Sequence, residues 1–161
     1  MMDHAENLRS ALDLPALSQI GMVVANLGET VAYYENTLGT GKFVVSDRDF
    51  ELKFEYIEYR GRRVDSEFLM AFGPLGGLEL EFIQTMKGPT LYDEFVERAG
   101  EGIHHLGFDI DDLDERLARY RNLGIEVLME GRTRHGGFAY LDTESIGGMI
   151  VELIQRPSIR A

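Results

Sequence analysis

The sequence predicts an α+β protein built from two tandem βαβββ modules, because several short patterns occur twice along the chain. The segments Gly76–Gln84 and Gly147–Gln155 share the pattern G-G-x-x-x-E-x-I-Q. Upstream of them, Ser18–Gly21 and His104–Gly107 form a second matching pair of segments. Internal repetition of this kind indicates a duplicated structural unit. At a constant offset of 86 positions, from 19 to 105, the matching pairs are Gln19 with His105, Gly21 with Gly107, Leu27 with Leu113, Glu29 with Glu115, Ala32 with Ala118 and Tyr34 with Tyr120.

Each module is predicted to begin with a short strand that carries one candidate functional side chain. The strands are Gln19–Val24 and His105–Ile110, in which apolar residues are dense. Successive side chains of a strand point to opposite faces, and the glycine two residues after Gln19 or His105 leaves open space on the same face. Both candidates should therefore point away from the helices, whereas His104 falls on the apolar face and is expected to pack against a helix.

A helix follows each of these strands, and its start and its end are both marked in the sequence. A residue that suits an N-cap stands before each helix, with a glutamate three residues later, which is the spacing of a capping pair. A glycine stands where each helix should stop, because glycine readily adopts the left-handed conformation of that position. The predicted caps are Asn26 with Glu29 and Asp112 with Glu115, and the predicted stops are Gly39 and Gly124.

Three further strands complete the second module, and a longer stretch completes the first. The predicted strands are Lys42–Ser46, Glu51–Tyr59, Glu67–Phe72, Leu78–Gln84, Ile125–Met129, Phe138–Asp142 and Met149–Gln155. The glutamates of the two tails lie at positions 81 and 152, an offset of 71, which leaves the first module longer by 15 residues. The extra length is placed between about Asp47 and Arg63 as a long hairpin.

The domain boundaries follow from the positions of the repeats. Residues 1–15 are expected to form an N-terminal extension, helical in character, and residues 16–86 the first module. Residues 87–101 read as a linker with a helix at Thr90–Ala99, and residues 102–157 as the second module.

Four side chains at equivalent positions of the two modules are candidate metal ligands. Glu81 and Glu152 lie in the middle of apolar strands, where a carboxylate is costly unless something pairs with it. If the sheets curve into a cup, these two residues meet Gln19 and His105 on its concave wall. An amide oxygen, an imidazole nitrogen and two carboxylates suit one divalent ion such as Zn²⁺, Ni²⁺, Co²⁺, Mn²⁺ or Fe²⁺, whereas calcium would require more oxygens.

Composition excludes several classes of protein and partner. The chain has 161 residues, of which 44% are hydrophobic and 27% charged, as is usual for a globular protein. A formal net charge of −12 argues against nucleic acids and anionic membranes as partners. There is no cysteine, and no apolar run approaches the roughly 20 residues of a membrane span. The N-terminus lacks the features of a signal peptide, so a cytoplasmic location is expected.

The tandem modules, the run Gly102–Asp112 with its His-His pair, and the glutamate of the second tail together resemble the vicinal oxygen chelate superfamily. This superfamily includes glyoxalase I, methylmalonyl-CoA epimerase, extradiol dioxygenases and bleomycin-resistance proteins. The resemblance covers about Ala16 to Pro157 and implies a cup-shaped mixed sheet, one bound divalent ion and a possible homodimer. The His-His run and the linker resemble the epimerase branch most. The set Gln19, Glu81, His105 and Glu152 resembles the ligands of some glyoxalase I enzymes instead.

The resemblance favours a metal-dependent isomerase or epimerase that removes a proton next to a carbonyl, with an acyl-CoA thioester as the small-molecule substrate. A glyoxalase I activity is the alternative, although no arginine follows Gln19 to hold a glutathione carboxylate. A non-catalytic binding protein of the antibiotic-resistance type is a third reading, and the four matching ligands count against it. An extradiol dioxygenase would need two histidine ligands, and only His105 qualifies.

Glu67 and Glu152 are the candidate catalytic residues. Glu67 lies 14 residues before Glu81, and the same spacing in the second module reaches Phe138. An unpaired carboxylate beside a metal suits proton transfer, and epimerase-like relatives use a glutamate at about this position as a base. Glu152 would serve if a ligand glutamate loosened from the ion. Glu79 is expected to be a carboxylate at the rim of the cup.

A basic hairpin stands out on this acidic chain. It contains Arg60, Arg62 and Arg63, with Lys53 nearby, and a second basic loop contains Arg132, Arg134 and His135. Either segment is a solvated turn or an anion grip for a substrate that carries phosphate or carboxylate groups.

Overall fold

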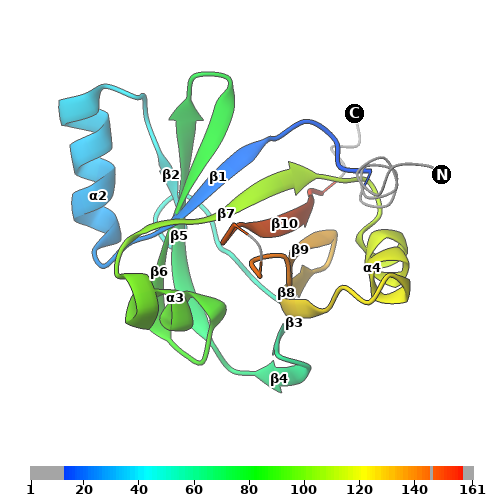
Figure 1. Cartoon of the computed structure of the whole chain (residues 1–161). Coiled ribbons are helices and arrows are strands. Elements are labelled where there is room, and N and C mark those ends of the chain that lie inside the picture. Colours follow the sequence, from blue (N-terminus) through cyan, green and yellow to red (C-terminus); the bar gives the residue numbers. More distant parts are fainter. Residues whose placement is uncertain (1–12, 146, 158–161) are drawn as a thin grey trace.

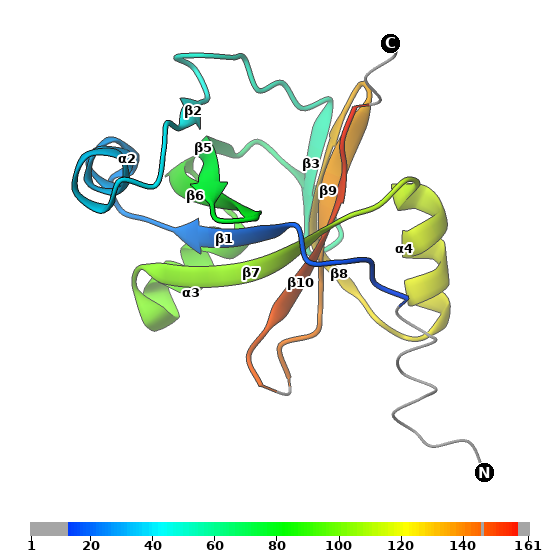
Figure 2. The same cartoon turned by 90° about the horizontal axis from the view of Figure 1, so that it is seen from above.

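The computed structural model describes residues 13–145 and 147–157, so most of the predicted N-terminal extension lies outside the described residues. The described chain forms a ten-stranded mixed sheet flanked by three helices (Figure 1). The sheet curls into a half-barrel, and from above, β1 and β7 run across the direction of β9 and β10 (Figure 2). The α+β class and the cup-shaped mixed sheet predicted from the repeats are thereby confirmed. None of the described helices is long and apolar enough to cross a membrane.

Both modules follow the order βαβββ. The first contains β1 (Gln19–Val23), α2 (Leu27–Tyr33, which continues into a π-helical turn at Tyr34–Leu38), β2 (Val44–Val45), β5 (Glu67–Leu75) and β6 (Leu78–Lys87). The second contains β7 (Gly102–Asp109), α4 (Leu113–Asn122), β8 (Val127–Thr133), β9 (Gly136–Leu141) and β10 (Ile150–Gln155). Between them lies α3 (Leu91–Ala99), and an additional hairpin comprises β3 (Tyr56–Tyr59) and β4 (Arg62–Val64).

The two modules join along their first strands. β1 and β7 pair antiparallel, and each runs parallel to the last strand of its own module, β6 or β10. The sheet order is β2-β5-β6-β1-β7-β10-β9-β8-β3-β4. The four strands that carry the candidate ligands are therefore neighbours at the centre of the sheet.

The extra segment of the first module does not form the long hairpin that its sequence predicts. The strand predicted at Glu51–Tyr59 begins only at Tyr56, and β3 pairs with β8 of the second module instead of with its own. Residues 51–55 cross between the modules in an irregular conformation, with Leu52 and Phe54 packed on the interior of the cup. The alternation of side chains in a strand indicates which face is buried, but it does not identify the neighbouring strand. The sequence pattern therefore does not predict that this segment crosses to the second module.

The predicted helix ends are confirmed. Asn26 Oδ1 accepts a hydrogen bond from Glu29 N at 3.1 Å, and Asp112 Oδ1 accepts one from Glu115 N at 3.0 Å. Gly39 adopts a left-handed conformation with φ of 66° after the first helix, and Gly124 has φ of 77° after α4. The linker helix α3 follows Thr90, as predicted.

Three apolar clusters hold the sheet and helices together. One lies beneath α2, a second beneath α4, and the third fills the interior of the cup around Phe68, Met70, Tyr92, Phe138 and Tyr140. The third cluster surrounds the candidate ligands with aromatic rings, which lowers the local dielectric constant and strengthens every charge interaction there.

Candidate metal centre

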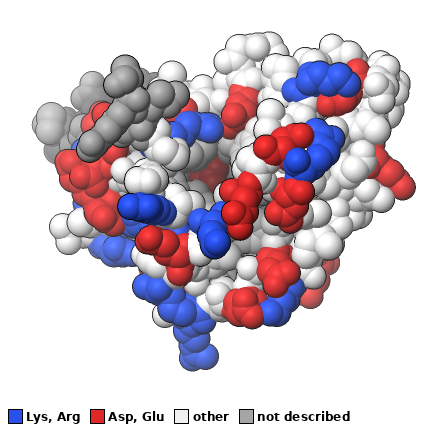
Figure 3. Space-filling model, turned by 180° about the vertical axis from the view of Figure 1, so that it is seen from behind, with Lys and Arg blue, Asp and Glu red and all other residues white. Residues whose placement is uncertain are grey.

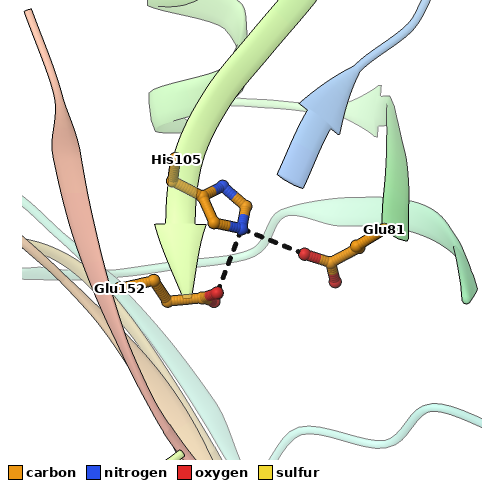
Figure 4. A group of neighbouring side chains, drawn as sticks. All are labelled: Glu81, His105 and Glu152. Carbon is orange, nitrogen blue, oxygen red and sulfur yellow. Dashed lines mark ion pairs between the residues drawn. The ribbon is translucent and has the colours of Figure 1, made fainter. Parts of the chain in front are cut away.

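The four side chains predicted as ligands converge at the centre of the sheet. His105 Nε2 lies 3.2 Å from Glu81 Oε2, 3.0 Å from Glu152 Oε2 and 3.2 Å from Gln19 Oε1. Figure 4 shows Glu81 and Glu152 approaching the same edge of the imidazole ring from opposite sides. None of the four residues is more than 2% exposed. The sequence repeat therefore located the cluster correctly, and the role of its members as ligands stays a prediction.

Two glycines make room for this convergence, one in each module. In the pairing of β1 with β7, Gly21 lies opposite His105 and Gly107 lies opposite Gln19. A Cβ atom on Gly21 would fall 1.9 Å from Cε1 of the His105 ring, and one on Gly107 would fall 3.0 Å from Gln19 Oε1. Each glycine thus leaves space for the candidate ligand of the other module, which explains why the glycine two residues after each ligand repeats.

The cluster has the properties of a cation site. Glu81 Oε2 and Glu152 Oε2 are buried and, apart from their ion pairs with His105 Nε2, have no hydrogen-bond partner. One ring nitrogen carries at most one proton, so it cannot satisfy three oxygen atoms at once. The candidate ligand atoms of Glu81, His105 and Glu152 all lie within 4.8 Å of one another. Ligands about 2.0–2.2 Å from a shared ion are separated by comparable distances, so these residues fit a divalent metal.

Without a metal, protons take the place of the cation. Burial raises the pKa of Glu81 to about 7, against the opposing effect of His105. Burial alone would lower the pKa of His105, but the charge of Glu152 and the contacts with both carboxylates outweigh it and raise that pKa to about 9. His105 in the imidazolium form therefore balances the carboxylates when no ion is bound, and binding of a metal must release protons.

We expect the metal-free protein to lose stability as the pH rises from about 5 to about 9. Both folded-state pKa values are raised, so the folded protein binds more protons than the unfolded chain in this range. The contribution of Glu81 is complete below its ordinary pKa of 4.5 and is lost as the pH passes about 7. The contribution of His105 is complete below 6.5 and is lost as the pH passes about 9. Thermal unfolding with a chelator present would measure both.

The matched control for this pH series is Glu81→Gln, which removes one of the two titrating groups. Its unfolding midpoint should fall less steeply than that of the wild type between pH about 5 and 7, because the proton bound by Glu81 is absent. Identical profiles below pH 7 would show that Glu81 does not carry the proton assigned to it.

Gln19 is oriented by a charged pair that the sequence did not reveal. Its amide nitrogen donates to Glu79 Oε1 at 2.8 Å, and Arg156 Nη2 donates to the same oxygen at 2.8 Å. Arg156 Nε also donates to Asp109 at 2.8 Å. A carboxylate only accepts hydrogen bonds, so Glu79 fixes the amide nitrogen outward and the amide oxygen toward His105. Glu79 lies at the rim as predicted. Because it stands two residues before Glu81, on the same face of β6, the sequence already indicated that it lies near the candidate ligands.

The cluster lies at the wall of an apolar cavity of about 210 Å³. Gln19, Glu81 and Glu152 supply its polar surface, and its remaining walls are largely aromatic and aliphatic. Among the residues that line it are Leu52, Phe54, Met70, Phe72, Phe138, Ile154 and Arg156. Leu52 and Phe54 belong to the crossing segment, so the extra length of the first module builds part of this cavity. The same two residues also line a larger groove of about 720 Å³.

The structure does not bring Glu67 to the cluster. Glu67 is exposed at the start of β5 opposite Lys87, and it lines the larger groove. The predicted equivalence of Glu67 with Phe138 is wrong, because Phe138 pairs with Ile154 as Met70 pairs with Ile83. The turn between β9 and β10 is longer than the turn between β5 and β6, so a fixed spacing of 14 residues does not transfer. The base role of Glu67 stays a prediction.

The basic hairpin is largely engaged within the chain. Arg60 donates to both carboxylate oxygens of Glu94, at 2.8 and 2.7 Å. The guanidinium of Arg63 lies 3.3 Å from the centroid of the Tyr56 ring. Acidic and basic side chains are interspersed on the face shown in Figure 3, which is hollowed near its centre. These contacts favour the interpretation of the hairpin as an ordinary turn, and its role as an anion grip stays a prediction.

Comparison with known proteins identifies the family. Residues 18–140 match the model of the Glyoxalase/Bleomycin resistance protein/Dioxygenase superfamily. The chain belongs to this superfamily. Membership confirms the resemblance seen in the repeats, because the match spans most of both modules.

The relatives agree with this assignment. The chain is 25% identical over 143 residues to the uncharacterized protein YqjC of Bacillus subtilis strain 168, a match that covers 86% of this chain and 91% of that protein. Methylmalonyl-CoA epimerase from Mycobacterium tuberculosis aligns with a TM-score of 0.58 and 17% identity over 88% of each chain. A variant of Streptomyces coelicolor methylmalonyl-CoA epimerase in complex with 2-nitronate-propionyl-CoA aligns with a TM-score of 0.62 and 20% identity. The alignment covers 92% of the present chain and 99% of the epimerase chain. At such identities the likeness to these structures shows the shared fold.

Proposed function

We propose that this protein is a metal-dependent isomerase or epimerase that removes a proton from the carbon next to a carbonyl group. The observation that carries the proposal is the pair of buried carboxylates at the wall of an apolar cavity, each with one oxygen whose only partner is the shared nitrogen of His105. Gln19, Glu81, His105 and Glu152 would hold one divalent ion, with Zn²⁺, Ni²⁺, Co²⁺, Mn²⁺ and Fe²⁺ as candidates. When bound, the ion would supply Lewis-acid stabilisation of the negative charge that develops on a substrate oxygen.

The residues of this chain would bind the substrate and move the proton. The apolar walls of the cavity exclude water from the reacting carbon, which keeps a carboxylate basic. Glu152 faces the cavity, and its Oε2 has no partner besides His105, so it would accept the proton if it loosened from the ion. Gln19 presents its amide oxygen because Glu79 holds its amide nitrogen. Glu67, on the larger groove, is the other candidate base.

An acyl-CoA thioester is the proposed substrate class. Solved structures with the same fold include methylmalonyl-CoA epimerases, one of them in complex with 2-nitronate-propionyl-CoA. The shared fold and the position of the carboxylates support this class. The resemblance to this superfamily also implies a homodimer, and we include a homodimer of this chain in the proposal.

A glyoxalase I activity is the second candidate, because the donor set of one amide, one imidazole and two carboxylates resembles that of some glyoxalase I enzymes. Both reactions move a proton next to a carbonyl. The hemithioacetal of methylglyoxal and glutathione would therefore be assayed beside the acyl thioesters, and turnover of the hemithioacetal alone would select this alternative.

Substitution of each candidate base would show whether Glu152 or Glu67 accepts the proton. We expect Glu152→Gln to lower solvent-deuterium exchange at C2 of methylmalonyl-CoA and related 2-substituted acyl thioesters by about 10²–10⁴-fold, because the proton acceptor is lost. Glu67→Gln should keep exchange within about threefold of the wild type, since Glu67 lies outside the cluster. Exchange would be followed by NMR, with the metal content of each variant determined in parallel.

Two outcomes would contradict this assignment. Loss of exchange in Glu67→Gln with the metal retained would make Glu67 the base. Metal binding by the wild type without exchange in any thioester or hemithioacetal would favour a non-catalytic binding protein.

A further inference from the structure

His104 occupies a bulge in the strand that carries the imidazole ligand. Gly21 of β1 pairs with His105 of β7, but the next residue, Met22, pairs with Ile103. His104 is therefore an extra residue on β7, and such bulges redirect side chains away from strict alternation. His104 packs against Tyr92 and Phe95 of helix α3, as predicted. The bulge also turns its ring toward His105.

The two histidine rings lie nearly perpendicular and contact each other through their Nδ1 atoms inside the protein. His104 Nδ1 lies 3.0 Å from His105 Nδ1, and the ring centroids are 5.3 Å apart at 84°. His104 is 3% exposed, and the rings of Tyr92, Phe95 and Tyr140 enclose it at centroid distances of 5.2–5.4 Å. This packing leaves His104 little freedom to turn away from its neighbour.

A single proton between the two Nδ1 atoms decides what His105 can bind. If His105 Nδ1 carries the proton, it donates to His104 Nδ1, and His105 Nε2 is free to offer its lone pair to a cation. If His104 Nδ1 carries the proton, the neutral His105 must hold its own on Nε2, which then points at the oxygens of Glu81 and Glu152 and cannot ligate a metal.

We propose that His104 is a positioning residue that accepts the His105 Nδ1–H and so holds His105 in the tautomer able to bind a metal through Nε2. Partners of this kind orient ligating histidines, and their loss weakens metal binding by about 10–100-fold. The role usually falls to a carboxylate or a backbone carbonyl, and here a second, neutral imidazole adjacent in sequence supplies it. The inference rests on the proposed metal centre.

The test uses two variants of nearly equal shape. Asparagine places an acceptor oxygen near the position of the imidazole Nδ1, whereas leucine has a methyl group there. We expect His104→Leu to weaken Zn²⁺ binding by about 10–100-fold in a chelator competition, and His104→Asn to stay within about threefold of the wild type. In thermal unfolding without metal, His104→Asn should be less stable than His104→Leu, because Asn buries an amide hydrogen that lacks an acceptor.

A merely structural role for His104 would give a different pattern. Equal metal affinity in the two variants, whether reduced or unchanged, would overturn the proposal. Two-bond ¹H–¹⁵N spectra of the zinc-loaded wild type provide a second readout that needs no variant. They should show a proton on His105 Nδ1 protected from exchange, and a proton on His104 Nδ1 instead would overturn the proposal. A wild type that binds no divalent ion would remove the metal centre itself, an outcome distinct from a failure of the His104 assignment alone.

Discussion

Replacement of Gly21 by alanine is expected to lower divalent metal affinity by about 100-fold and to destabilise the protein by about 1–3 kcal/mol. The new Cβ would fall 1.9 Å from Cε1 and 2.0 Å from Nε2 of the His105 ring. These distances are too short for any contact, so the ring must leave its position between Glu81 and Glu152. Isothermal titration with a divalent ion and denaturant unfolding would measure the two effects.

The control for this prediction is Gly28→Ala in helix α2. A Cβ atom there would meet only Asn26 Oδ1, at 3.6 Å, which is an ordinary contact. Alanine in a helix is favoured over glycine by about 0.5–1 kcal/mol, so this variant should be slightly more stable and bind metal like the wild type. Unchanged metal affinity in Gly21→Ala would show that His105 is not a ligand in the position described.

Replacement of His105 by alanine is expected to cost about 3–5 kcal/mol of folding free energy in the metal-free protein at pH 8. The two ion pairs of His105 join it to Glu81 and Glu152, at 3.2 and 3.0 Å, and the variant leaves these carboxylates buried side by side without a cation. The loss should be larger at pH 5 than at pH 8, because the pKa of His105 is raised to about 9 and its stabilising contribution is complete only below 6.5. Denaturant unfolding at both pH values would measure the difference.

His135→Ala is the matched control, since His135 is exposed in the turn between β8 and β9. It should change stability by less than about 0.5 kcal/mol at either pH. A loss in His105→Ala that does not depend on pH would indicate that a packing defect, and not the uncompensated carboxylates, destabilises the variant.

The internal repeat makes the cluster predictable from the amino-acid sequence. Gln19 and His105 recur at the same place in two similar segments, as do Glu81 and Glu152. When two copies of a module join through their first strands, equivalent side chains meet at the junction. The glycines two residues after Gln19 and His105 belong to the same pattern, and the pairing of β1 with β7 gives their physical reason.

The features that sequence patterns do not predict depend on the details of strand pairing. The bulge that brings His104 against His105 exists only where β7 meets β1. The crossing of β3 to β8 depends on a neighbour that strand periodicity does not identify. The counterpart of Glu67 was misplaced because two turns differ in length. The orientation of Gln19 depends on Arg156, which lies 77 residues after Glu79 in the chain.

Diffraction from crystals soaked with Mn²⁺ or Zn²⁺, with anomalous scattering to locate the ion, tests the central claim most directly. We predict one ion per chain between Gln19 Oε1, Glu81, His105 Nε2 and Glu152, at about 2.0–2.2 Å from its ligand atoms. An ion bound only elsewhere, or His105 still paired with both carboxylates at saturating metal, would contradict it.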